Sequence, residues 1–210
     1  MMTHYQIIKQ DDICICIFEN NFSSEELLAL FDNPEIYNEE LAHFRGEKRK
    51  KEFLGLRFAL KKCLDDKEYK VIYSQDGKPR LVEKSIHISF SHTARWNVAI
   101  THPTQKIGVD IEIPAEKLKK VYHRFLNHRE QEYFHKDTDL ETLCLLWSSK
   151  ETLYKIIGSE AVDFSKQLHI FPFDKKESGE ISAQHLTNGK RYRLQYKITP
   201  SYVIVFGIDQ

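Results

Sequence analysis

The sequence predicts an α+β protein of two similar halves, and the order of its elements is the main reason. Two long stretches, residues 47–64 and 140–157, have apolar residues at helical spacing. Short β-branched runs, separated by Gly, Pro and Asn turn signals, accompany each stretch. The expected order is helix, strands, helix, strands, which favours a small antiparallel sheet covered by a long helix in each half. We place the two domains at residues 1–105 and 106–210.

The first half begins with a β-branched run at 13–18, which predicts a strand. Ser23 and Glu26 have the spacing of a capping box, so a helix is expected to begin there. The helix at 47–64 has an apolar stripe and a basic start. Further strands are expected at 69–73, 86–90 and 98–101, with turn chemistry at 76–79 and 103–104.

The second half begins with an apolar strand at 107–111. After Pro114 the pattern becomes helical through residue 125, and Asn127 is placed to begin another helix. The helix at 140–157 has the strongest pattern, and Gly158 supplies its stop. The remaining strands are expected at 167–171, 192–198 and 202–208, with a hairpin turn at 188–189.

Charge and composition exclude several classes of protein. The chain has 31 basic and 31 acidic side chains, evenly divided between its halves, so neither half is expected to bind nucleic acid or a membrane by bulk charge. No apolar run approaches the ~20 residues of a membrane-spanning helix, and the N-terminus lacks a signal-peptide pattern. Four cysteines show no CxxC spacing, so we expect reduced thiols and a cytoplasmic location: Cys14, Cys16, Cys63 and Cys144.

Asp110 and Glu112 form the first acidic cluster. On a strand they point to the same face because the side-chain period is two. Two adjacent carboxylates repel each other unless water or a cation surrounds them, and oxygen ligands of this kind suit Mg²⁺. The alternative is an ordinary strand end that enters a solvated turn at Pro114.

Glu151 and Lys155 form the second cluster, on the helix with the strongest pattern. They are four residues apart and therefore share a face, which also contains Trp147. One interpretation is a surface ion pair worth ~0.3–0.5 kcal/mol. The other is a third carboxylate ligand for the metal, with Lys155 holding a phosphate or assisting proton transfer.

Together the two clusters resemble the signatures of the 4′-phosphopantetheinyl transferases. The strand segment at 108–112, GVDIE, is similar to the family's G-[IV]-D-[IVL]-E, and the helix segment at 147–155, WSSKETLYK, to its W-x-x-K-E-x-x-x-K. Three further segments resemble the Sfp-type branch of this holo-acyl-carrier-protein synthase superfamily: Gly77-Lys78-Pro79, Ser91-His92, and Arg124-Phe125 with Glu130. The resemblance implies a monomer built as a pseudo-dimer of two α/β halves.

The resemblance also implies an activity. Family members transfer the phosphopantetheine arm of coenzyme A to a serine of an apo acyl or peptidyl carrier protein and release adenosine 3′,5′-bisphosphate. Asp110, Glu112 and Glu151 would ligate Mg²⁺, with Mn²⁺ as the other candidate ion, together with the pyrophosphate of coenzyme A. Lys155 would contact that pyrophosphate or polarise the leaving oxygen.

Two carboxylates are candidates for the general base. Glu151 would accept the serine proton directly or through a metal-bound water. Glu130 would do so if its loop faces the site, but Asn127 with Glu130 also fits an N-cap and its N3 partner, which explains Glu130 without chemistry. Lys150 points roughly 100° around the helix from Glu151 and would serve either the phosphates or solvation.

The resemblance assigns the 3′-phosphate of coenzyme A to the first half. Lys78, Ser91 and His92 match the family segments, although a lone histidine is more often structural. Arg49, Lys51 and Arg57 are looser candidates, because most of this basic run would equally form a solvated face.

A group of basic residues follows the predicted strand that contains Asp110: Lys117, Lys119, Lys120 and Arg124. Carrier proteins are usually acidic along the helix after their serine, so these residues would form either a docking patch for a carrier or a solvated helix face. Fatty-acid, polyketide and nonribosomal peptide carriers all fit. The rival functions are another Mg²⁺ enzyme acting on a diphosphate, and a non-catalytic relative that binds coenzyme A or a carrier.

Overall fold

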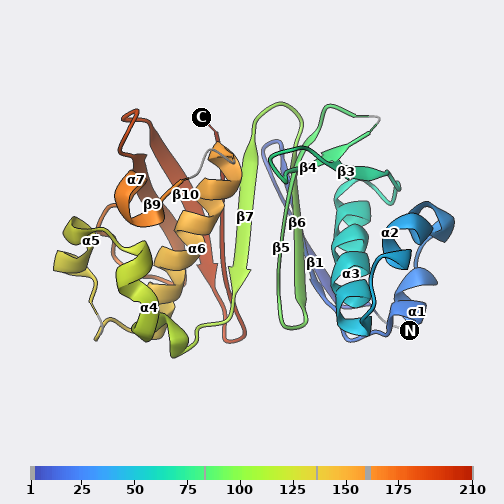
Figure 1. Ribbon diagram of the computed structural model, residues 1–210, viewed down its shortest axis with the longest axis horizontal. Coiled ribbons are helices and arrows are strands. Elements are labelled where there is room, and N and C mark those ends of the chain that lie inside the picture. The colour runs from blue at the N-terminus through green and yellow to red at the C-terminus, as the bar shows by residue number, and fades with distance from the viewer. Residues whose placement is uncertain (1–2, 83, 136, 159–161, 210) are drawn as a thin grey trace. The chain divides into compact units, whose positions relative to one another are not determined.

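The computed structural model describes residues 3–82, 84–135, 137–158 and 162–209. The chain divides into two compact units, Met1–Thr104 and Gln105–Gln210. Each unit contains an antiparallel sheet and a long helix, so the predicted α+β class is confirmed (Figure 1).

In the N-terminal unit six strands form a sheet of order β1-β2-β6-β5-β4-β3. The long helix α3 (Glu47–Cys63) packs on β2, β5 and β6, and α1 (Ser24–Leu28) packs on α3. The buried core lies between the helix and the sheet. The strands are β1 (Tyr5–Gln10), β2 (Ile13–Glu19), β3 (Val71–Tyr73), β4 (Pro79–Leu81), β5 (His87–Thr93) and β6 (Trp96–His102).

Three short helices complete this unit: α1 (Ser24–Leu28), the 3₁₀ helix η1 (Pro34–Tyr37) and α2 (Asn38–Ala42). The predicted capping box is present, because the Ser23 side chain accepts from the Glu26 amide while Glu26 accepts from the Ser23 amide. The predicted turn before Pro79 closes the β3–β4 hairpin. There the amide of Gly77 donates to Ser74 O over 2.8 Å, and Gly77 has φ 73°, which favours glycine.

In the C-terminal unit five strands form a sheet of order β7-β11-β10-β9-β8. The long helix α6 (Leu140–Ile157) lies across the sheet on β7 and β11, and α4 packs on α6. Asp139 caps its start, which the sequence analysis did not predict, and Gly158, at φ 104°, follows its end, as predicted. The strands are β7 (Ile107–Glu112), β8 (Leu168–Ile170), β9 (Ser178–His185), β10 (Arg191–Ile198) and β11 (Val203–Ile208).

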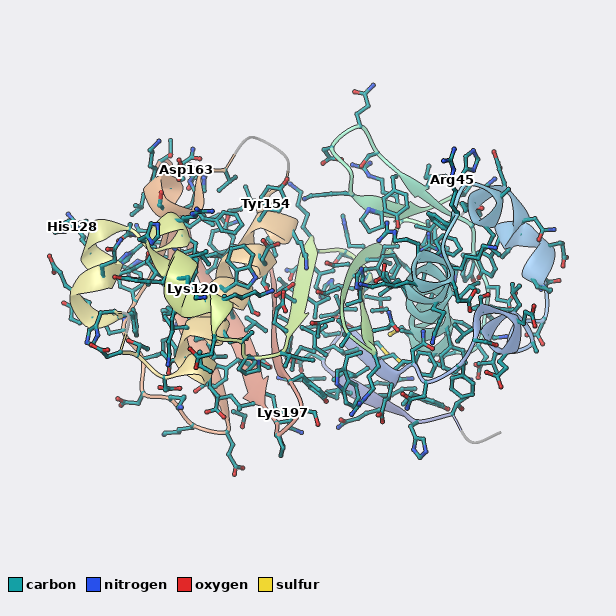
Figure 2. The ribbon with its side chains drawn as sticks, turned by 60° about the horizontal axis from the view of Figure 1, so that its bottom comes forward. Arg45, Lys120, His128, Tyr154, Asp163 and Lys197 are labelled. Atoms are coloured by element: carbon teal, nitrogen blue, oxygen red, sulfur yellow. The ribbon has the colours of Figure 1, made fainter. Side chains whose placement is uncertain are left out.

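The smaller helices of this unit are α4 (Lys117–Phe125), α5 (His128–Tyr133) and α7 (Phe164–Gln167). Figure 2 labels Lys120 on α4, His128 on α5 and Asp163, the residue before α7. Among the described helices, none combines the length and the apolar composition needed to cross a bilayer.

Candidate functional site

The first part of the site is the acidic end of β7. Asp110 and Glu112 alternate with Val109 and Ile111, whose side chains are fully buried. A Cβ placed on Gly108 would lie 2.4 Å from Thr152 O, so the face of β7 that contains Gly108 is packed directly against α6. Because residues two apart share a strand face, Asp110 and Glu112 also face α6. The glycine of the sequence motif therefore permits the close approach of strand and helix.

The second part of the site is the face of α6 opposite these carboxylates. Burial raises the pKa of Glu151, and the charges of Asp110 and Glu112 raise it further, while Lys155 lowers it. The carboxylate on the helix is thus electrostatically coupled to both carboxylates on the strand. The charges of the three residues that the sequence grouped as metal ligands therefore interact between strand and helix.

Lys155 links the helix to the strand. Its Nζ donates to Asp110 Oδ1 over 2.8 Å and to Val109 O over 2.9 Å. The Asp110 side chain is 7% exposed and the Lys155 side chain 24% exposed. A partly buried charged hydrogen bond of this kind is stronger than a surface ion pair, so Lys155 fixes the position of the Asp110 carboxylate.

The donor set has the chemistry that Mg²⁺ prefers, because all three side chains offer carboxylate oxygens. Within the described parts of the chain, however, no three His, Cys, Asp or Glu side chains are close enough together to hold a metal ion. Asp110 Oδ1 is engaged by Lys155. Binding of a divalent cation by Asp110, Glu112 and Glu151 would therefore require their side chains to rearrange from the positions described here.

The position of Lys150 differs from the expectation that it contacts phosphates or solvent. Its side chain is fully buried, and its Nζ donates to Glu130 Oε2 over 2.6 Å. The same ammonium also lies 2.5–3.2 Å from the carbonyl oxygens of Phe125, Phe164 and Leu168. Since four oxygens enclose it, Lys150 does not contact a phosphate in this geometry, and its role is to join α6 to the chain around α5 and β8.

Glu130 is likewise enclosed. It completes the capping box with Asn127, because the backbone amide of Asn127 donates to Glu130 Oε2 over 2.6 Å. The other oxygen, Glu130 Oε1, accepts from the backbone amide of Ile170 over 2.6 Å. With the Lys150 ammonium as a further donor, each carboxylate oxygen is occupied. A general base must reach the proton that it accepts, and this fully buried group does not. The structure therefore favours the cap interpretation of Glu130.

In the N-terminal unit the most unusual side chain is Arg57 on α3. It is 2% exposed, and its three guanidinium nitrogens are buried with no hydrogen-bond partner among the described residues. The guanidinium carbon lies over three aromatic rings, 4.4 Å from the centroid of Phe53, 5.4 Å from Phe90 and 5.9 Å from Tyr73. A buried cation held only by rings keeps its hydrogen-bonding capacity for an anion.

The other proposed phosphate contacts lie on neighbouring elements of the same unit. Arg49 donates to Glu52 over 3.0 Å, and His92 on β5 is 3.9 Å from the same carboxylate. Glu52, which sequence reasoning did not single out, thus joins the start of α3 to the Ser-His segment. Lys78 lies in the β3–β4 hairpin, Ser91 on β5 and Lys51 on α3. Their roles as coenzyme A ligands stay predictions.

On α4, Lys117, Lys120 and Arg124 are exposed, while Leu118 and Phe125 are buried. Lys119 pairs with Glu116 over 3.4 Å. The helix therefore presents three exposed cations on its solvent face, with Lys120 labelled in Figure 2.

Comparison with known proteins bears on this arrangement. No curated protein gives a significant match. Residues 106–206 match a family model described as 4′-phosphopantetheinyl transferase superfamily. The matched segment contains β7, α6 and the three carboxylates described above. The C-terminal unit therefore contains a domain of the 4′-phosphopantetheinyl transferase superfamily.

Proposed function

We propose that the protein transfers the 4′-phosphopantetheine arm of coenzyme A to a serine of an apo acyl or peptidyl carrier protein. Adenosine 3′,5′-bisphosphate is the second product, and the reaction depends on Mg²⁺. The observation that carries the proposal is the coupling of Asp110 and Glu112 on β7 with Glu151 on α6, inside the domain that matches the transferase superfamily.

The metal ligands in this proposal are Asp110, Glu112 and Glu151. When bound, the cation supplies stabilisation of the negative charge that moves onto the leaving phosphate. Lys155 holds Asp110 on the helix side of the strand and is partly exposed, so its ammonium is close to any pyrophosphate bound at these carboxylates.

The transfer itself is a substitution at phosphorus. The carrier serine oxygen attacks the phosphorus next to the pantetheine, and the bond to the adenosine-side phosphate breaks. The serine proton must leave at the same time, and Glu151 is the preferred acceptor because it is grouped with Asp110 and Glu112, and burial together with their charges raises its pKa. Glu130 is not needed for this step, because its oxygens are already engaged.

The N-terminal unit would bind the adenosine end of coenzyme A. Arg57 supports this, because its guanidinium is buried without a hydrogen-bond partner among the described residues. Lys78, Ser91 and His92, with Arg49 and Lys51, are the remaining contacts that we propose for the 3′-phosphate. The exposed cations of α4 would attract an acidic carrier protein.

The test is mass spectrometry of an apo carrier protein incubated with coenzyme A, Mg²⁺ and this protein. We expect the carrier to gain the mass of the phosphopantetheine arm, and the gain to be lost with a chelator. Asp110→Asn, Glu112→Gln and Glu151→Gln should each nearly abolish it while the far-ultraviolet spectrum is unchanged. A variant with near wild-type turnover at low Mg²⁺ would remove that residue from the ligand set, and no gain with several carriers would overturn the proposal.

A further inference from the structure

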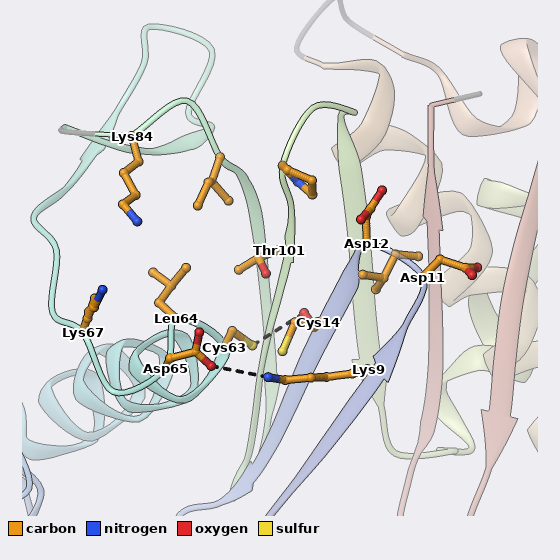
Figure 3. A pocket seen from close by; sticks show the side chains of 13 residues that line it. Lys9, Asp11, Asp12, Cys14, Cys63, Leu64, Asp65, Lys67, Lys84 and Thr101 are labelled. Carbon is orange, nitrogen blue, oxygen red and sulfur yellow. Dashed lines mark hydrogen bonds and ion pairs between the residues drawn. The ribbon is translucent and has the colours of Figure 1, made fainter.

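A pocket of about 320 Å³ lies in the N-terminal unit (Figure 3). The turn between β1 and β2 forms one wall, and the end of α3 with the residues after it forms another. Two cysteines line it, Cys14 from β2 and Cys63 from the last turn of α3. The proposed transfer reaction uses neither of them.

The two thiols are in contact. Cys63 Sγ lies 3.5 Å from the carbonyl oxygens of Cys14 and Ala99, and the Cys63 side chain is close enough to Cys14 to lower the pKa of its thiol. Figure 3 shows the two sulfur atoms facing each other where the helix end meets the strand. A thiol that donates to a neighbouring sulfur stabilises the thiolate of that neighbour.

The charges around the pocket modify this effect. The hydrogen bond from Cys63 lowers the pKa of Cys14 to about 7, with burial opposing it, Lys9 assisting and Asp65 opposing. Lys9 and Asp65 also pair with each other over 3.4 Å. The other charged groups that line the pocket are Asp11, Asp12, Lys67 and Lys84.

The other cysteines provide a contrast. Cys16 is two residues further along β2 and fully buried, and burial together with the Cys14 charge raises its pKa to about 12. Cys144, in the C-terminal unit, is also fully buried, and burial raises its pKa. Cys14 is therefore distinguished from both by its pocket and by its thiol partner.

We propose that Cys14 and Cys63 are an oxidation site at which a peroxide converts the two thiols into a disulfide that joins β2 to α3. The Cys14 thiolate attacks one peroxide oxygen, the O–O bond breaks, and the departing hydroxide takes a proton to leave as water. The resulting sulfenic acid is attacked by the Cys63 sulfur, and its hydroxyl leaves as water with the Cys63 proton. Two thiols and one hydrogen peroxide thus give one disulfide and two waters.

Labelling of the native protein with limiting iodoacetamide between pH 6 and 9 tests the first step. Peptide mass spectrometry should find Cys14 alkylated first, with a midpoint near pH 7 and roughly threefold faster at neutral pH than an ordinary thiol of pKa ~8.5, because its larger thiolate fraction outweighs its lower nucleophilicity. Cys16 and Cys144 should react only after denaturation. Equal or earlier labelling of Cys16 or Cys144 in the native protein would overturn the assignment of Cys14 as the reactive thiol.

Treatment of the native protein with hydrogen peroxide tests the second step. We expect a disulfide-linked peptide pair containing Cys14 and Cys63, reversed by dithiothreitol. Cys63→Ser should abolish it, and Cys14 should then be trapped by dimedone as a sulfenic acid, whereas Cys16→Ser should leave the disulfide intact. Absence of the pair while both thiols stay reduced, or a dominant pairing of Cys14 with Cys16, would overturn the proposal.

Discussion

Nζ of Lys150 lies 2.6 Å from Oε2 of Glu130, and neither side chain is exposed to solvent. Burial raises the pKa of Glu130 and lowers the pKa of Lys150, and the mutual attraction of the two charges opposes both shifts. The pair joins α6, which carries Glu151, to the start of α5. Glu130, a candidate base, and Lys150, a candidate phosphate contact, therefore support the helix on which the proposed base lies.

Lys150→Met should strongly destabilise the protein, because it leaves the Glu130 carboxylate buried beside backbone donors without its cation. Breaking a buried pair on one side costs about 3–5 kcal/mol. Urea unfolding measures this loss. The double variant Lys150→Met, Glu130→Gln should be less destabilised than the sum of its single variants, and strict additivity would contradict the coupling.

Glu130→Gln distinguishes a structural from a catalytic role. We expect a loss of stability, because one of its two oxygens becomes a donor that faces existing donors. Below its unfolding temperature the variant should transfer phosphopantetheine at a rate within about tenfold of the wild type, measured as kcat. A general base contributes ~10²–10⁴-fold, so a loss of that size in a folded variant would restore Glu130 as the base.

Gly108→Ala tests the close approach of β7 to α6. The new Cβ would lie 2.4 Å from Thr152 O, a backbone atom that cannot move without shifting the helix. We expect a loss of about 1–3 kcal/mol in unfolding free energy and a lower kcat, because Asp110 would move relative to Glu151. Gly46→Ala is the control, since a Cβ there meets nothing within 4 Å. Equal stability of the two variants would refute the packing argument.

Asp163 provides a pH-dependent prediction. Hydrogen bonds from Ser165 and Lys166 lower the pKa of Asp163 from 3.8 to about 2, at the start of α7. Because the folded pKa is depressed, the stabilisation is complete above pH ~4 and is lost as pH falls through about 2. Asp163→Ala should therefore lower the thermal midpoint at pH 6 and have a smaller effect at pH 2. A difference that is constant with pH would exclude this linkage.

Most of the fold follows from local sequence patterns. The two long helices and the apolar strands have unambiguous periods, and the structure confirms them, as it confirms the stop at Gly158. Strands β1, β4 and β9 were not predicted: β1 and β9 have turn residues beside them, and β4 begins at Pro79, the last residue of the predicted turn. In β9 the buried positions Ile181, Ala183 and His185 alternate with polar residues, so a period of two was present but weak in apolar content.

The site was predictable where chemistry depends on spacing along one element. The shared face of Asp110 and Glu112 follows from strand geometry, and their approach to Glu151 follows from the resemblance. The burial of Lys150 was not predictable, because its partners Phe125, Glu130, Phe164 and Leu168 lie on other segments. Similarly, the sequence alone does not show that the side chain of Arg57 is buried while that of Arg49, on the same helix, is exposed.

Arg57 gives the sharpest test of coenzyme A binding by the N-terminal unit. A buried guanidinium without a hydrogen-bond partner among the described residues contributes little to folding, so Arg57→Met should be no less stable than the wild type in urea. If Arg57 holds a phosphate, the same variant should lose one charged hydrogen bond worth ~1.5–3 kcal/mol, about ten- to hundredfold in affinity. The loss should appear in the KM for coenzyme A and in calorimetric titration with adenosine 3′,5′-bisphosphate, with kcat little changed. Lys48→Met is the matched control, because that side chain lies on the same helix, is exposed and faces Glu52. Dephospho-coenzyme A, which lacks the 3′-phosphate, then tests which residues contact that phosphate. The wild type should use it less well than coenzyme A, and the double variant Lys78→Ala, His92→Ala should discriminate much less between the two substrates. An Arg57→Met variant that unfolds more easily but binds the nucleotide normally would assign Arg57 to the aromatic core alone.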